Sequence, residues 1–171
     1  EKGIELPSKE VSIPKREQKA EDFVAKNPRG QTPILELDDG TVIAESVAIM
    51  RYLEAGHPEP PLFGIDAKDR AIVEMWNRRV ELHYLGALAA AFRHTHPAMK
   101  EWEVPQIAEW GEANRPKAEA FLELLDKELA TRKFIAGDRF TIADITAMIA
   151  FEFMKPAKIA RPEHLTNVMR W

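Results

Sequence analysis

The sequence has no cysteine among its 171 residues. Disulfide frameworks, thiolate zinc sites and cysteine nucleophiles are therefore excluded within these residues. The longest apolar run, residues 84–92, is far shorter than the roughly 20 residues of a membrane-spanning helix. The sequence also contains no internal repeat or low-complexity tract. From these absences we expect a cytoplasmic protein with no membrane partner.

The sequence also has no excess of basic residues over acidic ones. The chain has 24 Lys and Arg against 28 Asp and Glu, a net charge of −4 and a pI near 5.8. Because proteins that bind nucleic acid usually present a basic face, we expect no nucleic-acid partner. The hydrophobic share of 45% is enough for a substantial core in one large or two small domains.

Residues 27–46 contain the most informative pattern. Two short runs of mostly Ile, Leu and Val, 34–37 and 41–44, flank Asp-Asp-Gly, so they predict a tight β-hairpin in which Gly40 adopts positive φ. A helical pattern of apolar residues follows from Ser46. The predicted order is loop, hairpin, helix.

This stretch reads Asn-Pro-Arg-Gly-Gln-Thr-Pro-Ile-Leu, then Asp-Asp-Gly-Thr, then Glu-Ser-Val-Ala-Ile-Met-Arg-Tyr-Leu. It resembles the glutathione-binding half of cytosolic glutathione transferases of the bacterial type, whose thioredoxin-like domain carries a cis-proline at the position of Pro33. The later run 134–144 is similar to the capping-box segment of the same family's helical domain. The resemblance covers essentially the whole chain.

The resemblance implies an α/β domain followed by an all-α domain. We expect a thioredoxin-like domain over residues 1–59 and a helical bundle over residues 60–171, because the Pro-rich segment 57–64 has low helix potential. Gly3 is typical of a helix end, and residues 10–13 predict a strand. We expect the family's first strand and helix, and its C-terminal end, to be absent from this sequence.

The rest of the pattern predicts helices. Residues 17–26 fit a short irregular helix, and apolar spacing predicts a long helix from Asp66 that ends before Pro97, then another over about 107–130. Thr141 and Asp144 form a capping box that opens a helix ending near residue 154. The chain closes with what we read as the first turns of a further helix, residues 168–171.

Glutathione offers two carboxylates, an ammonium group, an extended backbone and a sulfur. The Glu45 carboxylate suits the ammonium of its γ-glutamyl end, and Ser46 at a helix N-terminus suits the neighbouring carboxylate. From the residues alone, helix capping by Ser46 and dipole complementation by Glu45 are the simpler explanation of the pair. The resemblance favours glutathione binding.

By the same resemblance, Thr32 and Pro33 present the backbone of Thr32 to the cysteinyl unit, as a sheet edge would. Lys15 would neutralise the glycyl carboxylate, and Gln31 would contribute its side chain. From the residues alone, Lys15 fits a solvated loop equally well.

Activation of the sulfur requires a Tyr, Ser or Cys that stabilises the thiolate. In the family this residue follows the first strand, so we expect it in the absent N-terminal segment and name no catalytic residue. Leu85 and Ala89 are our candidates for contact with the electrophile, with Tyr84, Leu88 and Phe92 as alternatives. Such residues along a helix are also typical of a core.

The histidines include one pair with the spacing of metal ligands. His94-Thr95-His96 has no obvious third ligand, so we interpret it as surface decoration and predict no metal cofactor. His83 lies among apolar positions and is interpreted as a partly buried histidine.

The predicted activity is glutathione transfer to a small hydrophobic electrophile, with glutathione as substrate. The resemblance also implies a homodimer formed through the helix after Ser46 and the long helix after Asp66. Two alternatives stay open: a non-catalytic glutathione-transferase-like binding or scaffold protein, and a glutathione-dependent isomerase, dehalogenase or thiol reductase on the same fold.

Overall fold

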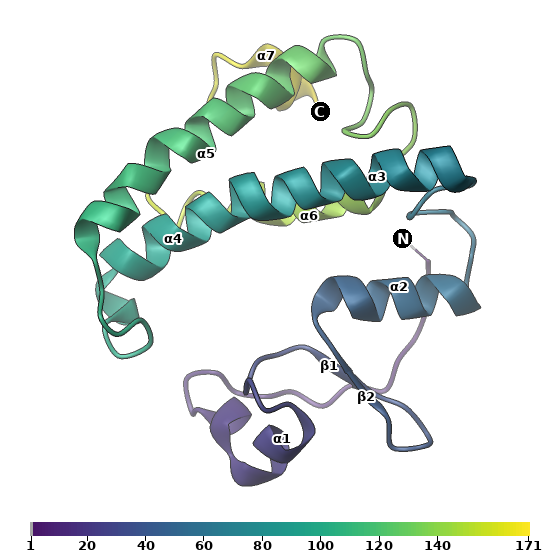
Figure 1. Cartoon of the computed structure of the whole chain (residues 1–171), viewed down its shortest axis with the longest axis vertical. Coiled ribbons are helices and arrows are strands. Elements are labelled where there is room, and N and C mark those ends of the chain that lie inside the picture. Colours follow the sequence, from purple (N-terminus) through teal and green to yellow (C-terminus); the bar gives the residue numbers. More distant parts are fainter. Residues whose placement is uncertain (1) are drawn as a thin grey trace. The chain divides into compact units, whose positions relative to one another are not determined.

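The computed structural model describes residues 2–171. The chain forms two compact units, one ending at Pro61 and the other spanning Leu62–Trp171, and each is described by itself (Figure 1). The first unit is a short two-stranded sheet with helices, and the second is all-helical. The fold is a thioredoxin-like domain followed by a helical domain, as the sequence predicts.

The first unit is built from five elements. They are the 3₁₀ helix η1 (Glu17–Lys19), α1 (Glu21–Lys26), β1 (Ile34–Glu36), β2 (Val42–Ala44) and α2 (Ser46–Gly56). The strands are antiparallel, with Ile34 opposite Ala44 and Glu36 opposite Val42. Gly40 turns the chain between the strands with φ +83°, which confirms the predicted hairpin.

The strand predicted over residues 10–13 is not formed. These residues form no helix or strand. Ile13 lies in a turn, and its carbonyl accepts a hydrogen bond from the Arg16 amide at 2.9 Å. The prediction was wrong because an alternating pattern becomes a strand only where another strand supplies hydrogen-bond partners. The sheet of the described chain consists of β1 and β2.

Burial is shallow throughout the first unit. Its apolar side chains, as far as the structure describes them, are at best half-buried, whereas Gln18 and Asn27 are buried. A cavity of about 550 Å³ is lined by residues from Leu6 to Val11, by α1, by Thr32 to Glu36 and by Ile49. This unit therefore has little dry core.

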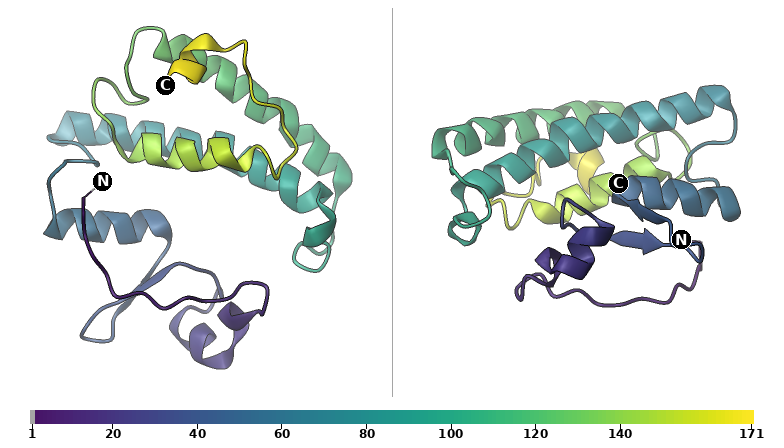
Figure 2. Two further views of the ribbon diagram at one scale, coloured as in Figure 1. Left: turned by 180° about the vertical axis from the view of Figure 1, so that it is seen from behind. Right: turned by 60° about the horizontal axis from the view of Figure 1, so that its bottom comes forward.

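The second unit contains the remaining helices. They are α3 (Ala67–Arg79), the π-helical η2 (Val80–Leu85), α4 (Gly86–Thr95), the 3₁₀ helix η3 (Pro97–Met99), α5 (Ala108–Leu129), α6 (Ile142–Phe153) and α7 (Thr166–Arg170). α3, η2 and α4 follow one another without a break, so the predicted long helix is real but contains a π segment. α5 packs against α4 and η2, the C-terminal part of this rod (Figure 2).

One apolar cluster forms the core of the second unit. Trp76, Tyr84 and Leu88 contribute to it from the α3–η2–α4 rod, and all three are no more than 2% exposed. α5 adds Leu122 and Leu125. The apolar residues whose spacing predicted these helices are thus the residues that pack against one another in the core.

The predicted capping box starts α6. Asp144, fully buried, accepts hydrogen bonds from the Thr141 amide at 2.9 Å and from the Thr141 hydroxyl at 3.0 Å. Its other oxygen accepts from the Ile135 amide at 3.0 Å and from the Trp171 indole at 2.9 Å. The cap therefore also holds the preceding loop and the last residue of the chain.

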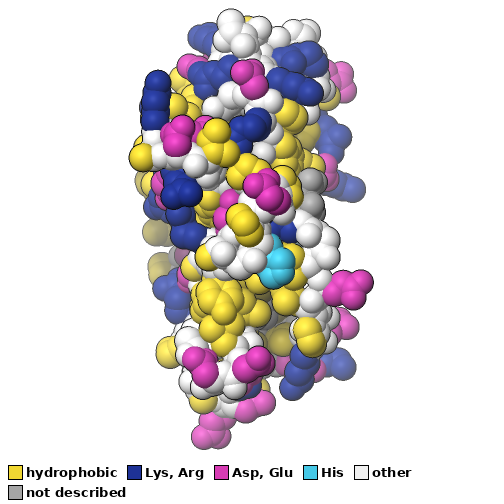
Figure 3. All heavy atoms as spheres, turned by 90° about the vertical axis from the view of Figure 1, so that its right-hand side faces the viewer, with side chains coloured by type: hydrophobic (Ala, Val, Ile, Leu, Met, Phe, Trp, Pro, Cys, Tyr) yellow, Lys and Arg dark blue, Asp and Glu magenta, His cyan; other side chains and the backbone are white. Residues whose placement is uncertain are grey.

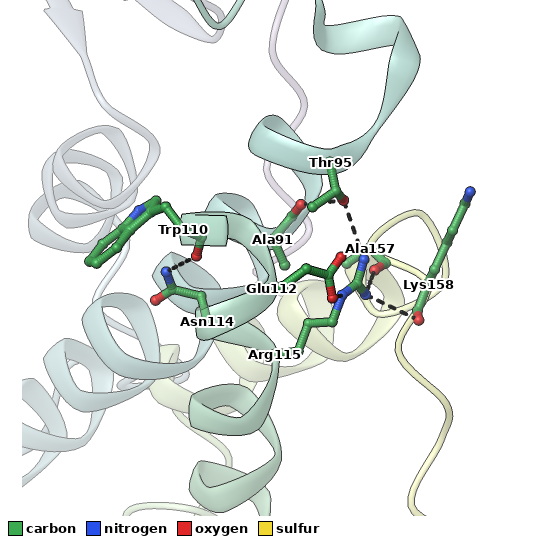
Figure 4. A network of polar contacts seen from close by, with 8 residues as sticks. All are labelled: Ala91, Thr95, Trp110, Glu112, Asn114, Arg115, Ala157 and Lys158. Carbon is green, nitrogen blue, oxygen red and sulfur yellow. Dashed lines mark hydrogen bonds and ion pairs between the residues drawn. The ribbon is translucent and has the colours of Figure 1, made fainter. Parts of the chain in front are cut away.

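A second polar cluster joins α4, α5 and the segment after α6 (Figure 4). The Arg115 guanidinium donates to the carbonyls of Ala157 and Lys158 at 2.5 and 3.2 Å, and to the Thr95 hydroxyl at 3.2 Å. Its Nε lies 2.8 Å from a Glu112 carboxylate oxygen. One side chain of α5 thus fixes two segments that are distant in sequence.

Hydrophobic side chains reach the surface among charged ones on the face shown in Figure 3. On the second unit the exposed large ones include Leu82, Trp110 and Leu124. None of the helices in residues 2–171 combines the length and apolar character needed to cross a bilayer.

Candidate functional site

The hairpin brings two predicted site segments together. Because Ile34 lies opposite Ala44, the residues just outside this pair, Pro33 and Glu45, emerge at the same end of the hairpin. The Thr32–Pro33 peptide bond is cis, as the resemblance implies. Thr32 and Ser46 are the next residues outward, so four of the predicted glutathione residues share one end of the sheet.

The loop before β1 is organised by a buried amide. Asn27, 7% exposed, donates from Nδ2 to the Gln31 carbonyl at 2.8 Å and accepts at Oδ1 from the Arg29 amide at 3.3 Å. Its carbonyl accepts from the Gly30 amide at 2.7 Å. These bonds close a turn in which Gly30 has φ +56° and its Cα approaches the Gln18 carbonyl too closely for a side chain. Asn27 thereby fixes the chain that enters Thr32.

Three side chains meet beside the hairpin end. The Arg29 Nε donates to the Gln31 Oε1 at 2.9 Å and lies 3.9 Å from the Glu45 Oε1. The Arg29 and Glu45 side chains are 69% and 72% exposed, so their attraction is weak and a ligand can replace it. Gln31 is thus held near Glu45 through Arg29.

Glu45 and Ser46 form the N-terminal end of α2. Glu45 has φ +69°, an uncommon conformation for a residue other than glycine, and its carbonyl accepts the Ile49 amide at 3.0 Å. The amides of the first helical turn, beginning with Ser46, therefore point out of the helix with no side-chain cap in the described chain. Open amides and the helix dipole favour an anion here.

The backbone of Thr32 is open to a ligand. Within residues 2–171 neither its amide nor its carbonyl has a hydrogen-bond partner, and the residue is exposed. Thr32 and Pro33 also line the 550 Å³ cavity of the first unit. An extended peptide backbone can pair with such a free edge.

Lys15 is distant in sequence from the hairpin residues and lies in the exposed turn before η1. Over the part of the chain that the structure describes, its ammonium has no ion-pair partner. Its neighbour Arg16 has φ +58°, which fixes the course of the turn. The ammonium is therefore available to a carboxylate.

The predicted electrophile residues lie on the α3–η2–α4 rod. Leu85 and Ala89 are half-buried, whereas the alternatives Tyr84 and Leu88 are buried in the core. Burial alone raises the pKa of Tyr84 well above its ordinary value, so this hydroxyl keeps its proton. His83 is exposed and not partly buried as predicted, because it borders an open hollow beside η2, α4 and α5 and not the packed core.

Arg29 is the residue that the sequence reasoning missed. The sequence shows it within Asn-Pro-Arg-Gly, where it reads as a turn residue. Only the hairpin register, which returns the chain to Glu45, reveals its second contact. The assembled group offers one carboxylate, one guanidinium, open helix amides and an open backbone edge, which together suit a zwitterionic extended peptide.

The chain is similar to known proteins over most of its length. Residues 1–55 match the family described as Glutathione S-transferase, N-terminal domain, and residues 89–171 match Glutathione S-transferase, C-terminal domain. Glutathione S-transferase 2 of Saccharomyces cerevisiae is 37% identical over 162 residues, which are 94% of this chain and 70% of that protein. GstA of Escherichia coli O157:H7 is 29% identical over 158 residues, 91% and 74% of the two chains.

Solved structures are similar over the same extent. A glutathione S-transferase domain-containing protein of Marinobacter aquaeolei is 39% identical with a TM-score of 0.87, covering 94% of this chain and 79% of its own. Gtt2 from Saccharomyces cerevisiae is 37% identical with a TM-score of 0.87, covering 94% and 78%. The chain therefore belongs to the glutathione S-transferase family of enzymes.

Proposed function

We propose that this protein binds glutathione at the hairpin end and transfers its thiol to a small hydrophobic electrophile. The observation that carries the proposal is the meeting of Thr32, Pro33, Glu45 and Ser46 through the register of β1 and β2. Each supplies a group that matches one part of the tripeptide.

The γ-glutamyl end carries both signs of charge. Its ammonium binds the Glu45 carboxylate, and its α-carboxylate binds the open amides and hydroxyl at Ser46. Arg29 lies beside the Glu45 carboxylate, its Nε 3.9 Å from that oxygen, and gives way to the ligand's ammonium. Gln31, joined to Arg29, supports the same end.

The cysteinyl unit pairs with the backbone of Thr32, which orients the sulfur, and Lys15 binds the glycyl carboxylate. The thiol loses its proton to solvent, and the thiolate attacks an electrophilic carbon. A C–S bond forms as the leaving group departs with its electron pair. This is transfer of an alkyl or aryl group to glutathione.

Leu85 and Ala89, four residues apart on the rod, are proposed to contact the apolar body of the electrophile. The expected setting is the cytoplasm, and the expected role is detoxification of reactive apolar compounds. We also propose a homodimer, which the exposed Tyr52 on α2 and Met75 on α3 favour because both are large apolar side chains. Sedimentation velocity tests this assembly.

The binding step is tested by calorimetric titration of glutathione into the full chain and into a Glu45→Ala variant. Loss of a charge-assisted hydrogen bond is worth about 1.5–3 kcal/mol, so the dissociation constant should rise roughly 10- to 100-fold. Asp38→Ala is the matched control: it removes the same charge from the exposed turn at the opposite end of the hairpin. Equal affinities of wild type and Glu45→Ala would refute this site.

A second variant separates backbone from side-chain recognition. Thr32→Ala keeps the amide and carbonyl, so glutathione affinity should stay within about twofold of wild type. Conjugation of glutathione to 1-chloro-2,4-dinitrobenzene then tests turnover. Tight binding without turnover of this or other aryl and alkyl halides would favour the non-catalytic binding protein.

A further inference from the structure

One dipeptide of this chain can undergo a reaction of its own backbone. Among the aspartates and asparagines of the sequence, Asp39 alone precedes a glycine. A backbone nitrogen attacks the side-chain carboxyl carbon of the preceding aspartate most readily when that nitrogen belongs to glycine, because glycine has no Cβ to hinder the approach. Asp39 and Gly40 are therefore the pair in this chain that is best suited to the reaction.

The pair lies in the turn between β1 and β2 (Figure 1). The Gly40 amide donates to the Leu37 carbonyl at 2.9 Å, and the Leu37 amide donates to the Thr41 carbonyl at 2.9 Å. Asp38, Asp39 and Gly40 thus form a three-residue loop, which Gly40 completes with φ +83°. All three residues are exposed, so water reaches the whole loop.

The Asp39 carboxylate turns toward the residues that follow it. Its Oδ1 accepts a hydrogen bond from the Thr41 amide at 2.8 Å. The contact spans Gly40, so the carboxyl group is held beside the segment that contains the Gly40 nitrogen. Hydrogen bonds from the Thr41 amide first, and then from its hydroxyl, lower the pKa of Asp39. The carboxyl group is therefore mostly ionised at neutral pH, which makes the reaction slow.

The turn can open without displacing packed side chains. Among residues 2–171, no atom beyond the adjacent residues lies within 4 Å of the position that a Cβ on Gly40 would occupy. The Gly40 nitrogen is freed for attack when its hydrogen bond to the Leu37 carbonyl breaks. Exposed turns with few packed contacts open locally at small cost in free energy.

We propose that the Asp39–Gly40 linkage isomerises spontaneously to isoaspartate. The Gly40 nitrogen attacks the Asp39 Cγ, a C–N bond forms, and the carboxyl hydroxyl leaves with the amide proton as water. Water then adds to the main-chain carbonyl of Asp39 in the resulting succinimide, and the bond from that carbon to the nitrogen breaks. The product has the same mass, but its peptide bond runs through Cβ and Cγ, and the former main-chain carbonyl is a carboxylate.

The new linkage adds one atom to the backbone of the loop. The ring that the Gly40 amide closes with the Leu37 carbonyl must then hold an extra methylene, and the carboxyl group that accepted from the Thr41 amide becomes part of the main chain. We expect β1 and β2 to lose part of their pairing next to the turn. Because that pairing places Pro33 beside Glu45, glutathione should bind less tightly, an effect that rests on the proposed function.

The first test measures isoaspartate in the folded full chain. The protein is kept for several weeks at physiological temperature in mildly acidic buffer, where more of the carboxyl group is protonated, and its peptides are then analysed by electron-transfer mass spectrometry. Isoaspartate should accumulate at residue 39 and not at Asp38 or Asp138, two exposed aspartates that precede larger residues. No isoaspartate at residue 39, or equal amounts at the three positions, would overturn the proposal.

The second test follows the effect on the hairpin. In the isoaspartyl form, isolated by anion-exchange chromatography, the amides of Leu37 and Gly40 should lose protection against hydrogen exchange, and the dissociation constant for glutathione should rise roughly fivefold. Treatment with protein L-isoaspartyl methyltransferase and S-adenosylmethionine, which returns the linkage to aspartate, should restore both. Asp39→Ser is the matched control: its hydroxyl can accept from the Thr41 amide, but it forms no succinimide and should not change on ageing.

The outcomes separate this inference from the proposed function. Unchanged exchange and unchanged glutathione affinity in the isoaspartyl form would overturn the effect on the hairpin. If fresh protein does not bind glutathione, the proposed function fails, whereas isoaspartate at residue 39 and faster exchange at Leu37 and Gly40 would still support the modification.

Discussion

Substitution of Asp144 should lower the free energy of unfolding by an amount that its hydrogen bonds allow us to estimate. Its carboxylate is fully buried and accepts hydrogen bonds from three N–H groups, those of Thr141, Ile135 and Trp171, at 2.9 to 3.0 Å, and from the Thr141 hydroxyl at 3.0 Å. Asp144→Ala removes the acceptor and leaves these donors without their partner.

Each N–H bond to a charged acceptor contributes about 1.5–3 kcal/mol, and these contributions are less than additive because part of the loop relaxes. We therefore expect Asp144→Ala to lower the free energy of unfolding by about 3–5 kcal/mol. For a unit of this size the melting temperature should fall by roughly 10 °C or more. Asp144→Asn keeps the shape but turns one acceptor into a donor, so it should cost about 1–3 kcal/mol.

The measurement is urea unfolding of the full chain followed by circular dichroism. Asp138→Ala is the matched control, because Asp138 is exposed and belongs to the same loop. If Asp144→Ala unfolds within about 1 kcal/mol of the Asp138→Ala control, the buried network does not stabilise the fold and the reasoning is refuted.

Three other residues give sharp predictions. Tyr84→Phe should leave the free energy of unfolding unchanged or raise it by up to about 1 kcal/mol, because the buried hydroxyl has no hydrogen-bond partner in the described chain. Burial raises the pKa of Tyr84 above 10.0, so at higher pH this tyrosine ionises in the unfolded chain but not in the folded one. The free energy of unfolding of the wild type should therefore fall as pH rises above 10.0. In urea unfolding from pH 8 to 11, Tyr84→Phe should lose less stability than the wild type. Gly64→Ala should cost about 2 kcal/mol or more in thermal melts, because Gly64 has φ +101° and an added Cβ would lie 2.7 Å from the Arg70 amide nitrogen. Hydrogen bonds from the Val168 amide first, and then from Asn167, lower the pKa of Asp126. The protection of the amides of residues 166–170 against hydrogen exchange, relative to the intrinsic rate at each pH, should therefore decrease as pH falls below 3.8, and Asp126→Asn should remove that change in protection.

Each of these has its own control. Tyr52→Phe, at an exposed tyrosine, should not alter the high-pH slope, and an equal change in both variants would contradict the role of burial. Gly40→Ala tests positive φ without a steric clash, since no atom lies within 4 Å of an added Cβ. A cost equal to that of Gly64→Ala would contradict the contact with Arg70. Unchanged exchange in Asp126→Asn at pH 6 would contradict its contact with α7.

Local signals in the sequence were enough for most elements. Asp-Asp-Gly between apolar runs predicts the hairpin, and Thr141 with Asp144 predicts the start of α6, because each signal acts over three or four residues. The strand over 10–13 failed for the opposite reason, since a strand requires a partner that no local pattern supplies. The π segment η2 also has no local signal, because helical spacing looks the same on both sides of it.

The candidate site was predicted in part for similar reasons. Glu45 and Ser46 are adjacent in sequence and lie at a recognisable helix start, so their pairing needed no structure. The approach of Arg29 to Glu45 depends on the turn at Asn27 and on the hairpin register together.

The hairpin register has a consequence for how this protein tolerates change. Because side chains alternate between sheet faces, a slip of one residue between β1 and β2 would turn every side chain of the slipped strand to the other face and move Pro33 out of line with Glu45. The turn around Gly40 lies at the far end of the strands, yet its length determines that alignment. Insertions and deletions there should therefore act on ligand affinity from a distance.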